Sequence, residues 1–229
     1  MKLPTRRRNG DANKHGRVRN PVGRSFKSIR GKYPSKKMGR MIQWESQLER
    51  DAILLLEYSP DITAYQEQPR KITYAMQGAV KTYFPDFEVW HTDGRHGYIE
   101  VKPDEIARRP DQKARFSHIE SKFNGEGSYF EILTENQIRT KPLLDNLRMV
   151  ERYRSSALRP TSWFTVKHHF EQLAVITFAQ AQVHLGGIDR VWALVADGIF
   201  STDLRSCITD QTIFQINVPR STNGTDIRN

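Results

Sequence analysis

Two adjacent strands joined by a short turn are the feature that most constrains this fold. Residues 82–90 and 97–102 are rich in β-branched and aromatic side chains, which favour extended backbone. Between them, His91-Thr92-Asp93-Gly94-Arg95 contains the Asp and Gly that are typical of tight turns. Strands linked this closely pair in antiparallel order. We therefore expect the rest of the fold to be arranged around this hairpin.

Helices and further strands on either side of the hairpin indicate an α/β fold. Apolar residues at helical spacing predict a first helix over about residues 44–58, which Pro60 ends. Three more strands are expected over about 62–66, 72–76 and 129–133, and two more helices over about 111–124 and 142–155. Strands paired as hairpins and then joined by a crossover helix predict a mixed sheet flanked by helices on both faces.

Positive charge is concentrated in the first 40 residues. They hold 14 Lys and Arg and one acid, a net charge of +13, whereas the rest holds 22 basic and 25 acidic residues, a net −3. The segment is also rich in Gly, Asn, Ser and Pro, so we expect a largely disordered arm. Such an arm is typical of polyanion binding, since Lys and Arg neutralise phosphates; a solubilising tail is the alternative. The candidate DNA contacts are Arg6, Arg7, Arg8, Lys36 and Lys37.

Two domains and a short tail are expected after residues 1–40. Residues 41–158 carry the strand and helix pattern described above. Residues 159–219 are mostly helical in pattern, with helices over about 163–173, 178–185 and 188–197 and a terminal hairpin from 200–204 and 212–216. Residues 220–229 are polar and form a tail.

Composition excludes several classes of protein. Hydrophobic residues make up 37% of the chain, too many for a wholly disordered protein. No apolar run reaches the length of a membrane span, and the basic N-terminus lacks the apolar stretch of a secretory signal. The single cysteine, Cys207, excludes an intramolecular disulfide and is expected to be a small core residue. These features favour a cytoplasmic protein without a membrane partner.

Asp86 and Glu100 are candidates for chemistry, and the turn decides whether they meet. If Thr92-Asp93-Gly94 is a three-residue loop with Gly94 in the left-handed conformation, the numbers of the two residues in each cross-strand pair add up to 186. Asp86 then lies opposite Glu100. A two-residue loop changes the sum to 187 and turns Asp86 to the other face. In either register, Glu100 and Lys102 share one face.

The first register would place two carboxylates and an ammonium together. Neighbouring carboxylates repel unless a proton or cation lies between them, and oxygen ligands favour Mg²⁺ or Mn²⁺. Such ions are typical of phosphodiester hydrolysis, because they polarise the phosphate and lower the pKa of a bound water. Lys102 would orient that water or neutralise charge on the phosphate, and the Val101 carbonyl is a further candidate metal ligand. The alternative is a cross-strand salt bridge of Lys102 with Asp86 or Glu100.

A fourth acid, Glu49, lies on the first predicted helix. Apolar residues follow it at spacings of three, four and seven, so Glu49 lies on or beside the buried stripe of that helix. An unpaired carboxylate there is costly, and a metal site would explain it. Pairing with Arg50 or with a flanking lysine is the alternative, and Glu45 is the fallback candidate one turn earlier.

These residues also form a pattern that resembles a known family. Pro85-Asp86 followed by Glu100-Val101-Lys102 is the PD-(D/E)xK nuclease pattern, which is weakly specific by itself. More specific are Trp44-Glu45-Ser46-Gln47-Leu48-Glu49-Arg50-Asp51, then Gln66-Glu67-Gln68-Pro69 and Phe84-Pro85-Asp86-Phe87. With them, the chain resembles the TnsA-type endonuclease subunit of heteromeric bacterial transposases. The likeness is strong over about residues 41–155 and looser beyond.

The resemblance implies a restriction-endonuclease-like fold and DNA cleavage. In that family a helix glutamate, a strand aspartate and the E/QxK pair bind two Mg²⁺ ions, and they map here to Glu49, Asp86, Glu100 and Lys102. The family subunit cuts the 5′ ends of the transposon, a DDE-type transposase cuts and joins the 3′ ends, and an AAA+ ATPase regulates the pair. The implied partners are therefore double-stranded DNA at transposon ends and these two proteins, in the bacterial cytoplasm.

Several alternatives stay open at this point. The C-terminal part resembles the family's winged-helix-like domain, yet the helix over 188–197 carries only Arg190, which favours protein docking over DNA reading. Gln68 lies where the family shows glutamine, and a structural role is favoured over support of the metal ligands or DNA contact. The alternative functions are a stand-alone restriction or repair nuclease of the same fold, and a non-catalytic DNA-binding or assembly subunit.

Overall fold

The computed structural model describes residues 29–154, 170 and 173–217 of the chain. Its contacts divide the chain into two compact units, Met1–Arg139 and Thr140–Asn229, each with its own buried residues. This boundary falls earlier than the expected one at residue 158. The reason is that the last helix expected in the nuclease domain packs with the helices of the second unit.

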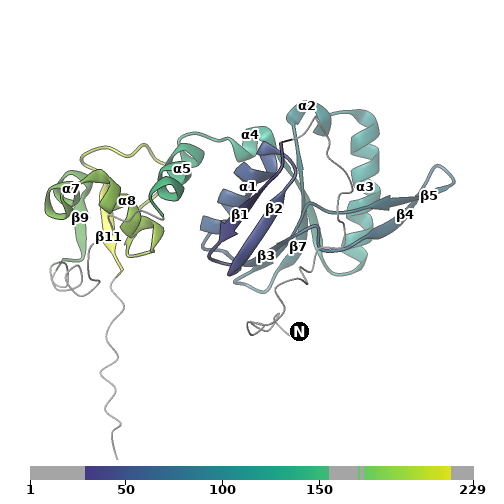
Figure 1. Ribbon diagram of the computed structural model, residues 1–229. Helices are drawn as coiled ribbons and strands as arrows, with labels where there is room; N and C mark the ends of the chain where they lie inside the picture. Colours follow the sequence, from purple (N-terminus) through teal and green to yellow (C-terminus); the bar gives the residue numbers. More distant parts are fainter. Residues whose placement is uncertain (1–28, 155–169, 171–172, 218–229) are drawn as a thin grey trace, which may run out of the picture. The chain divides into compact units, whose positions relative to one another are not determined.

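A four-stranded mixed sheet forms the centre of the first unit (Figure 1). In spatial order, its strands are β3 (Ile62–Glu67), β6 (Phe87–His91), β7 (His96–Lys102) and β8 (Tyr129–Thr134). β6 pairs with β3 and β7 in antiparallel order, whereas β7 and β8 are parallel. A parallel pair needs a crossover connection, which α3 (Pro110–Gly125) provides. The expected mixed sheet is confirmed.

Helices cover both faces of this sheet, also as expected. On one face, Phe123 of α3 stacks on Tyr98 of β7 and on Phe130 of β8, with ring centroids 4.1 and 5.7 Å apart. On the other face lies α1 (Gln47–Tyr58), whose apolar side chains are buried. Two short helices follow β7 and β8, namely α2 (Asp104–Ala107) and α4 (Glu135–Ile138).

A hairpin forms where the basic arm was expected to be disordered. β1 (Gly31–Ser35) and β2 (Arg40–Trp44) pair in antiparallel order. The buried carboxylate of Glu57 in α1 accepts hydrogen bonds from the hydroxyls of Ser35 and Tyr65 and from two backbone amides of the β1–β2 turn. The expectation of disorder up to residue 40 is therefore wrong for this part of the arm, because a buried acid of α1 holds it in place.

A second hairpin projects outwards past α3 (Figure 1). Among the described strands, β4 (Ile72–Met76) and β5 (Ala79–Tyr83) pair with each other and with no other strand. The single strand expected over residues 82–90 is therefore wrong, because residues 84–86 separate β5 from β6. Pro85 has no N–H to donate to a neighbouring strand, which explains why the ladder is interrupted there.

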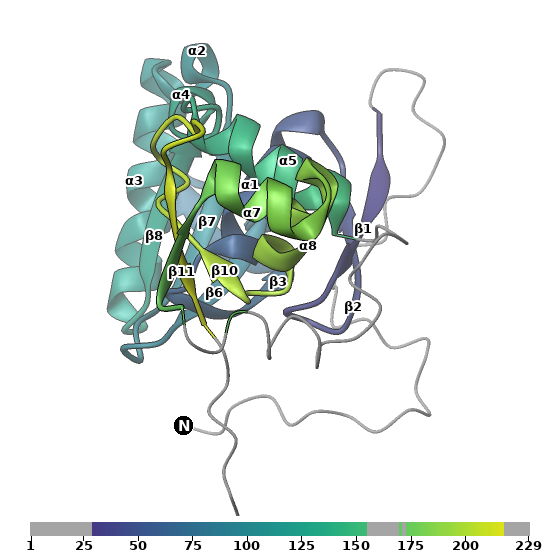
Figure 2. The ribbon, with the colours of Figure 1, turned by 90° about the vertical axis from the view of Figure 1, so that its left-hand side faces the viewer.

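The second unit combines helices with a small antiparallel sheet (Figure 2). The sheet has the order β10 (Phe200–Ser201), β11 (Ile213–Ile216) and β9 (Val175–Thr177). Phe178 and Phe200 lie against Phe214 in its core, with ring centroids 5.7 and 6.0 Å apart. Within its described residues, this unit contains the helices α5 (Leu143–Tyr153), α7 (Phe178–Leu185) and α8 (Ile188–Ala196).

Most expected elements of this unit are present. The helices predicted over 178–185 and 188–197 correspond to α7 and α8, and the predicted terminal hairpin corresponds to the β10–β11 pair. The helix predicted over 163–173 falls almost entirely outside the described residues. β9 was not predicted, because three residues are too few for a visible alternation. Cys207 is exposed in the loop between β10 and β11, so its expected place in the core is wrong.

No helix in the described part of the chain combines the length and apolar character needed to cross a membrane.

Candidate active site

The β6–β7 hairpin adopts the register that brings two acids together. Phe87 pairs with Ile99, and in every pair of this ladder the two residue numbers add up to 186. Gly94 has a φ of 87°, as expected for the left-handed residue of a three-residue loop. Of the two registers that the sequence left open, the one that the proposed chemistry needs is therefore present. It places Asp86 opposite Glu100 at the open end of the hairpin, away from the turn.

Asp86 is held by the backbone of the facing strand. Its Oδ2 accepts a hydrogen bond of 2.8 Å from the Val101 backbone N–H. This contact orients the carboxylate toward β7, where the neighbouring residues on the same face are Glu100 and Lys102. The Asp86 side chain is 16% exposed, so the group is largely removed from water but remains accessible from one side.

Lys102 lies between the two carboxylates. Its Nζ is 2.6 Å from Glu100 Oε1 and 3.8 Å from Asp86 Oδ2. The same ammonium donates to the Val101 carbonyl at 3.1 Å. The salt bridge that the sequence offered as an alternative is therefore present. It coexists with the clustering that a catalytic site requires, because one ammonium contacts both acids.

Tyr83 contributes to this cluster and was missed by sequence reasoning. Its hydroxyl donates a hydrogen bond of 2.5 Å to Glu100 Oε2, and both residues are buried. The Arg115 guanidinium lies 5.4 Å from the centre of the Tyr83 ring. The hydroxyl of a buried tyrosine needs a hydrogen-bond partner, so a tyrosine at a strand position of the sequence indicates that such a partner lies nearby. The identity of that partner depends on the break between β5 and β6, because this break sets where Tyr83 lies relative to β7. The sequence pattern did not reveal the break.

Glu49 lies in the first turn of α1 and has a second role there. Ser46 is the N-cap, and its hydroxyl accepts from the Glu49 backbone N–H at 3.1 Å. In return, the Glu49 carboxylate accepts from Ser46 Oγ at 3.0 Å and from the Glu45 backbone N–H at 2.8 Å. Ser followed three residues later by Glu is a capping-box spacing, so the sequence contained the signal that α1 begins at Gln47 rather than at residue 44.

The charges of these residues act on one another. Burial raises the pKa of Asp86 well above its ordinary value, and the Glu100 carboxylate adds to the rise. Burial also raises the pKa of Glu49, with a further contribution from the Glu45 carboxylate. Burial lowers the pKa of Lys102, but Glu100 and Asp86 together outweigh it, so the net change is upward. Glu49 itself contributes to the shifts of Asp86 and Lys102, so all four predicted catalytic residues belong to one electrostatic cluster.

Gln68 connects the start of α1 with β6. Its backbone N–H donates to the Asp86 carbonyl at 2.9 Å, and its side-chain amide donates to Glu45 Oε1 at 3.0 Å. The residue is buried and has a φ of 41°, in the left-handed region. These contacts agree with the structural role that was favoured for Gln68.

Part of the chain that carries this cluster resembles a known protein family. Residues 59–135 match a family model described as TnsA-like endonuclease N terminal. This stretch is similar to the N-terminal part of TnsA-like endonucleases. It includes Asp86, Glu100 and Lys102, whereas Glu49 precedes the matched range. The resemblance to TnsA-type endonucleases is confirmed, and a comparison with curated proteins finds no match.

The donor set of this cluster suits a hard divalent cation. Asp86 and Glu100 offer carboxylate oxygens beside the Val101 carbonyl. Within the described ranges, no three Asp, Glu, His or Cys side chains are grouped as a ready-made metal site, and Glu49 is occupied by the helix cap. Mg²⁺ commonly binds one or two carboxylates and keeps several waters, so a two-carboxylate set fits one such ion. A second ion remains a prediction.

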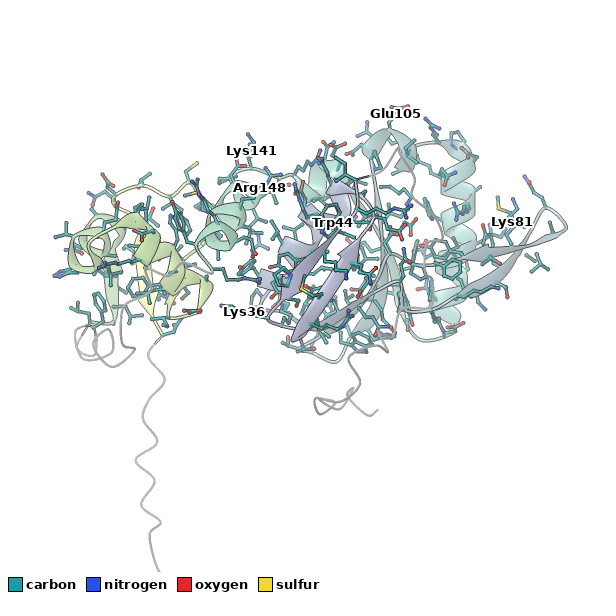
Figure 3. The ribbon with its side chains drawn as sticks, viewed as in Figure 1. Lys36, Trp44, Lys81, Glu105, Lys141 and Arg148 are labelled. Carbon is teal, nitrogen blue, oxygen red and sulfur yellow. The ribbon has the colours of Figure 1, made fainter. Side chains whose placement is uncertain are left out.

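Two of the basic residues that were predicted to contact DNA are described by the structure, and both lie outside this cluster. Lys36 and Lys37 lie in the turn between β1 and β2, where Figure 3 labels Lys36. Lys37 Nζ donates to two carbonyls at the C-terminus of α1, both at 2.7 Å, and burial lowers its pKa to about 8. Lys37 is thus a helix-capping cation in this structure. Arg6, Arg7 and Arg8 lie outside the described residues.

Proposed function

We propose that this protein is a Mg²⁺-dependent DNA endonuclease subunit of a heteromeric transposase, which cleaves the 5′ ends of a transposon during cut-and-paste transposition. The main support is the hairpin register, which brings Asp86, Glu100 and Lys102 together inside a TnsA-like endonuclease domain. That domain suggests DNA as the substrate and a Tn7-type transposase as a partner.

The residues of the cluster divide the work of phosphodiester hydrolysis. Asp86, Glu100 and the Val101 carbonyl would hold the metal, while the Val101 N–H and the Tyr83 hydroxyl keep the two carboxylates oriented. Lys102 supplies a positive charge that orients the attacking water or neutralises charge on the phosphate oxygens. The water oxygen forms a bond to phosphorus as the bond to the leaving sugar oxygen breaks. Mg²⁺, when bound, polarises the phosphate and makes water a better nucleophile.

Glu49 is the fourth proposed catalytic residue, and its two roles can be separated. Its charge acts on Asp86 and Lys102, while its carboxylate also serves the N-cap of α1. In Glu49→Gln the side-chain oxygen still accepts a hydrogen bond, but the negative charge is lost. We expect this variant to keep the helix and to lose cleavage, whereas a purely capping role predicts normal cleavage.

The direct test is cleavage of plasmid DNA by the full chain and its transposase partner in Mg²⁺. Asp86→Asn and Lys102→Ala are expected to slow cleavage by at least about 100-fold, in line with the loss of one group that stabilises developing charge. Asp93→Asn is the matched control, since it is the same substitution at the other end of the same hairpin and its side chain is 53% exposed. Wild-type rates for Asp86→Asn would contradict the site assignment.

The same assay separates the alternative functions. Cleavage by the chain alone, without a transposase, would favour a stand-alone restriction or repair nuclease. Absence of cleavage by the wild-type chain with its partner and Mg²⁺ would favour a non-catalytic assembly subunit. Cleavage that depends on both the partner and the metal is the outcome that our proposal predicts.

The second unit and the basic arm are assigned to partners rather than to catalysis. We propose that the second unit docks on a protein of the transposition complex, with the AAA+ ATPase as the expected candidate. Arg190, the single basic residue of α8, donates to the Leu185 carbonyl at 2.6 Å, which leaves this helix poorly suited to reading bases. The arm is proposed to bind phosphates, so removal of residues 1–28 should weaken DNA binding and reduce its salt dependence.

A further inference from the structure

The β4–β5 hairpin has one buried face and one exposed face. At its base, Ile72, Tyr74 and Tyr83 are buried in the cluster that packs on α3. On the other face the cross-strand pairs are small residues, and every one of them is exposed. They are the pairs Thr73 with Thr82 and Ala75 with Val80. Val80 is 79% exposed, so no described part of the chain covers this residue.

The charge of the hairpin indicates what kind of partner covers this face. Residues 69–85 contain three basic side chains and no acid. Arg70 is paired with Glu126, but among the residues that the structure describes, Lys71 and Lys81 have no ion-pair partner. Both lysines are exposed, but they lie on different faces of the hairpin. Lys71 shares the face of Thr73 and Ala75, whereas Lys81 pairs with Tyr74 on the opposite face, and Figure 3 labels it on the projecting part. A surface with unpaired cations and no acids favours a polyanion.

The base of the hairpin is joined to the candidate active site. Tyr83, the last residue of β5, donates its hydroxyl to Glu100. On β4, the Tyr74 hydroxyl accepts a hydrogen bond of 3.1 Å from Arg115 of α3, whose guanidinium also lies over the Tyr83 ring. The hairpin is therefore anchored at the cluster and extends away from it. A duplex bound along the hairpin would therefore extend from the candidate site.

We propose that the exposed face of the β4–β5 hairpin lies in the major groove of the duplex that the site cleaves, an inference that rests on the proposed function. The major groove is wide enough for a two-stranded ribbon, and small side chains let such a ribbon approach the base edges. The methyl groups of Thr73, Ala75, Val80 and Thr82 then face thymine methyls. Lys71, on the same face at the base of the hairpin, reaches a phosphate beside the groove.

The first test is binding of a short fluorescein-labelled duplex of random sequence to the full chain without Mg²⁺. Val80→Glu places a negative charge in the groove and should weaken binding by roughly tenfold or more. Val183→Glu on α7 is the matched control, since Val183 is 81% exposed, and it should bind as the wild type does. Lys71→Ala should lower the slope of log Kd against log salt concentration by about one, because one phosphate contact is lost.

The second test identifies the groove and separates DNA from a protein occupant. A duplex with 5-iododeoxyuridine in place of thymidine carries its photoreactive atom in the major groove, and irradiation should crosslink it to residues 71–83. Wild-type affinity of Val80→Glu, or crosslinks only elsewhere in the chain, would overturn the proposal. Loss of the transposase from Val80→Glu with unchanged DNA affinity would also overturn it, in favour of protein docking.

These measurements are independent of cleavage. If the wild-type chain crosslinks through the hairpin but cuts no DNA with its partner and Mg²⁺, the proposed function fails and the groove contact stands. If the wild-type chain cuts DNA and Val80→Glu binds and cuts equally well, the groove contact fails and the proposed function stands.

Discussion

Replacing Lys102 by Met removes the ammonium that separates two buried carboxylates. Glu100 is 4% exposed, and Lys102 Nζ lies 2.6 Å from it and 3.8 Å from Asp86. Met has a similar length, so the change removes the charge with little change in packing volume. The Tyr83 hydroxyl and the Val101 N–H still donate to the two acids, which prevents them from being left without any partner.

The expected loss of stability follows from these distances. Two opposite charges about 4 Å apart attract by about 4 kcal/mol at the effective dielectric constant of a protein surface. Removing one partner of a fully buried pair costs about 3–5 kcal/mol. Lys102 is 25% exposed, which screens the pair, and its own burial cost is recovered in the variant. We therefore expect a loss of about 2 kcal/mol, which corresponds to about 4–8 °C in Tm for a chain of this size.

The assay is thermal unfolding of both proteins in EDTA and in Mg²⁺. In EDTA the variant should unfold at the lower temperature, and Mg²⁺ should raise the Tm of the variant more than that of the wild type. The reason is that the ion no longer competes with the ammonium for the oxygens of Glu100 and Val101, and ligand binding stabilises the folded state. Lys122→Met is the control, because its pair with Glu126 at 3.4 Å is solvent-exposed and should contribute less than about 1 kcal/mol.

Two results would refute this reasoning. Equal Tm values for Lys102→Met and the wild type in EDTA would show that the two carboxylates do not need the ammonium. A Tm of the variant that does not respond to Mg²⁺ would show that the same oxygens do not bind a divalent ion.

Three further predictions concern the surroundings of the site. Burial lowers the pKa of Lys37 to about 8 from 10.5, so the unfolded chain binds more protons between these pH values and the free energy of unfolding should rise with pH. In urea unfolding, Lys37→Met should remove that rise, and an unchanged pH slope would contradict it. Gly94→Ala should lose about 1 kcal/mol because φ is 87°, whereas Gly125→Ala, in helical backbone with open space around it, should lose nothing in the same measurement. Ser46→Ala should cost about 1 kcal/mol by loss of the N-cap and should also slow cleavage, because Glu49 loses a hydrogen bond that orients it; normal cleavage would exclude that coupling.

Local sequence signals predicted the central part of the site well. The turn residues around Gly94 determine the loop length, and the loop length determines the register, because a slip of one residue turns every side chain to the other face. The sequence therefore reduced the choice to two registers, one of which places Asp86 on the face of Glu100 and Lys102. The elements of the mixed sheet were predicted for the same reason, since their patterns are local.

Contacts between distant segments were not predictable in this way. The Glu57 carboxylate orders the β1–β2 hairpin through Ser35, 22 positions earlier in the chain, and composition alone indicated disorder there. Tyr83 contacts Glu100 from β5, which residues 84–86 separate from β6. The prediction of one continuous strand over residues 82–90 did not contain this break. The boundary between the units likewise depends on where α5 packs, which helical spacing does not specify.

The left-handed backbone at Gln68 has a consequence for engineering this protein. A side chain at a φ of 41° costs about 1 kcal/mol relative to glycine, so Gln68→Gly would relieve local strain. The same change would remove the amide that ties Glu45 to the segment carrying the Asp86 carbonyl, and with it the fixed spacing between the N-terminus of α1 and β6. Selection for heat resistance alone would thus tend to favour a looser and slower nuclease at this position.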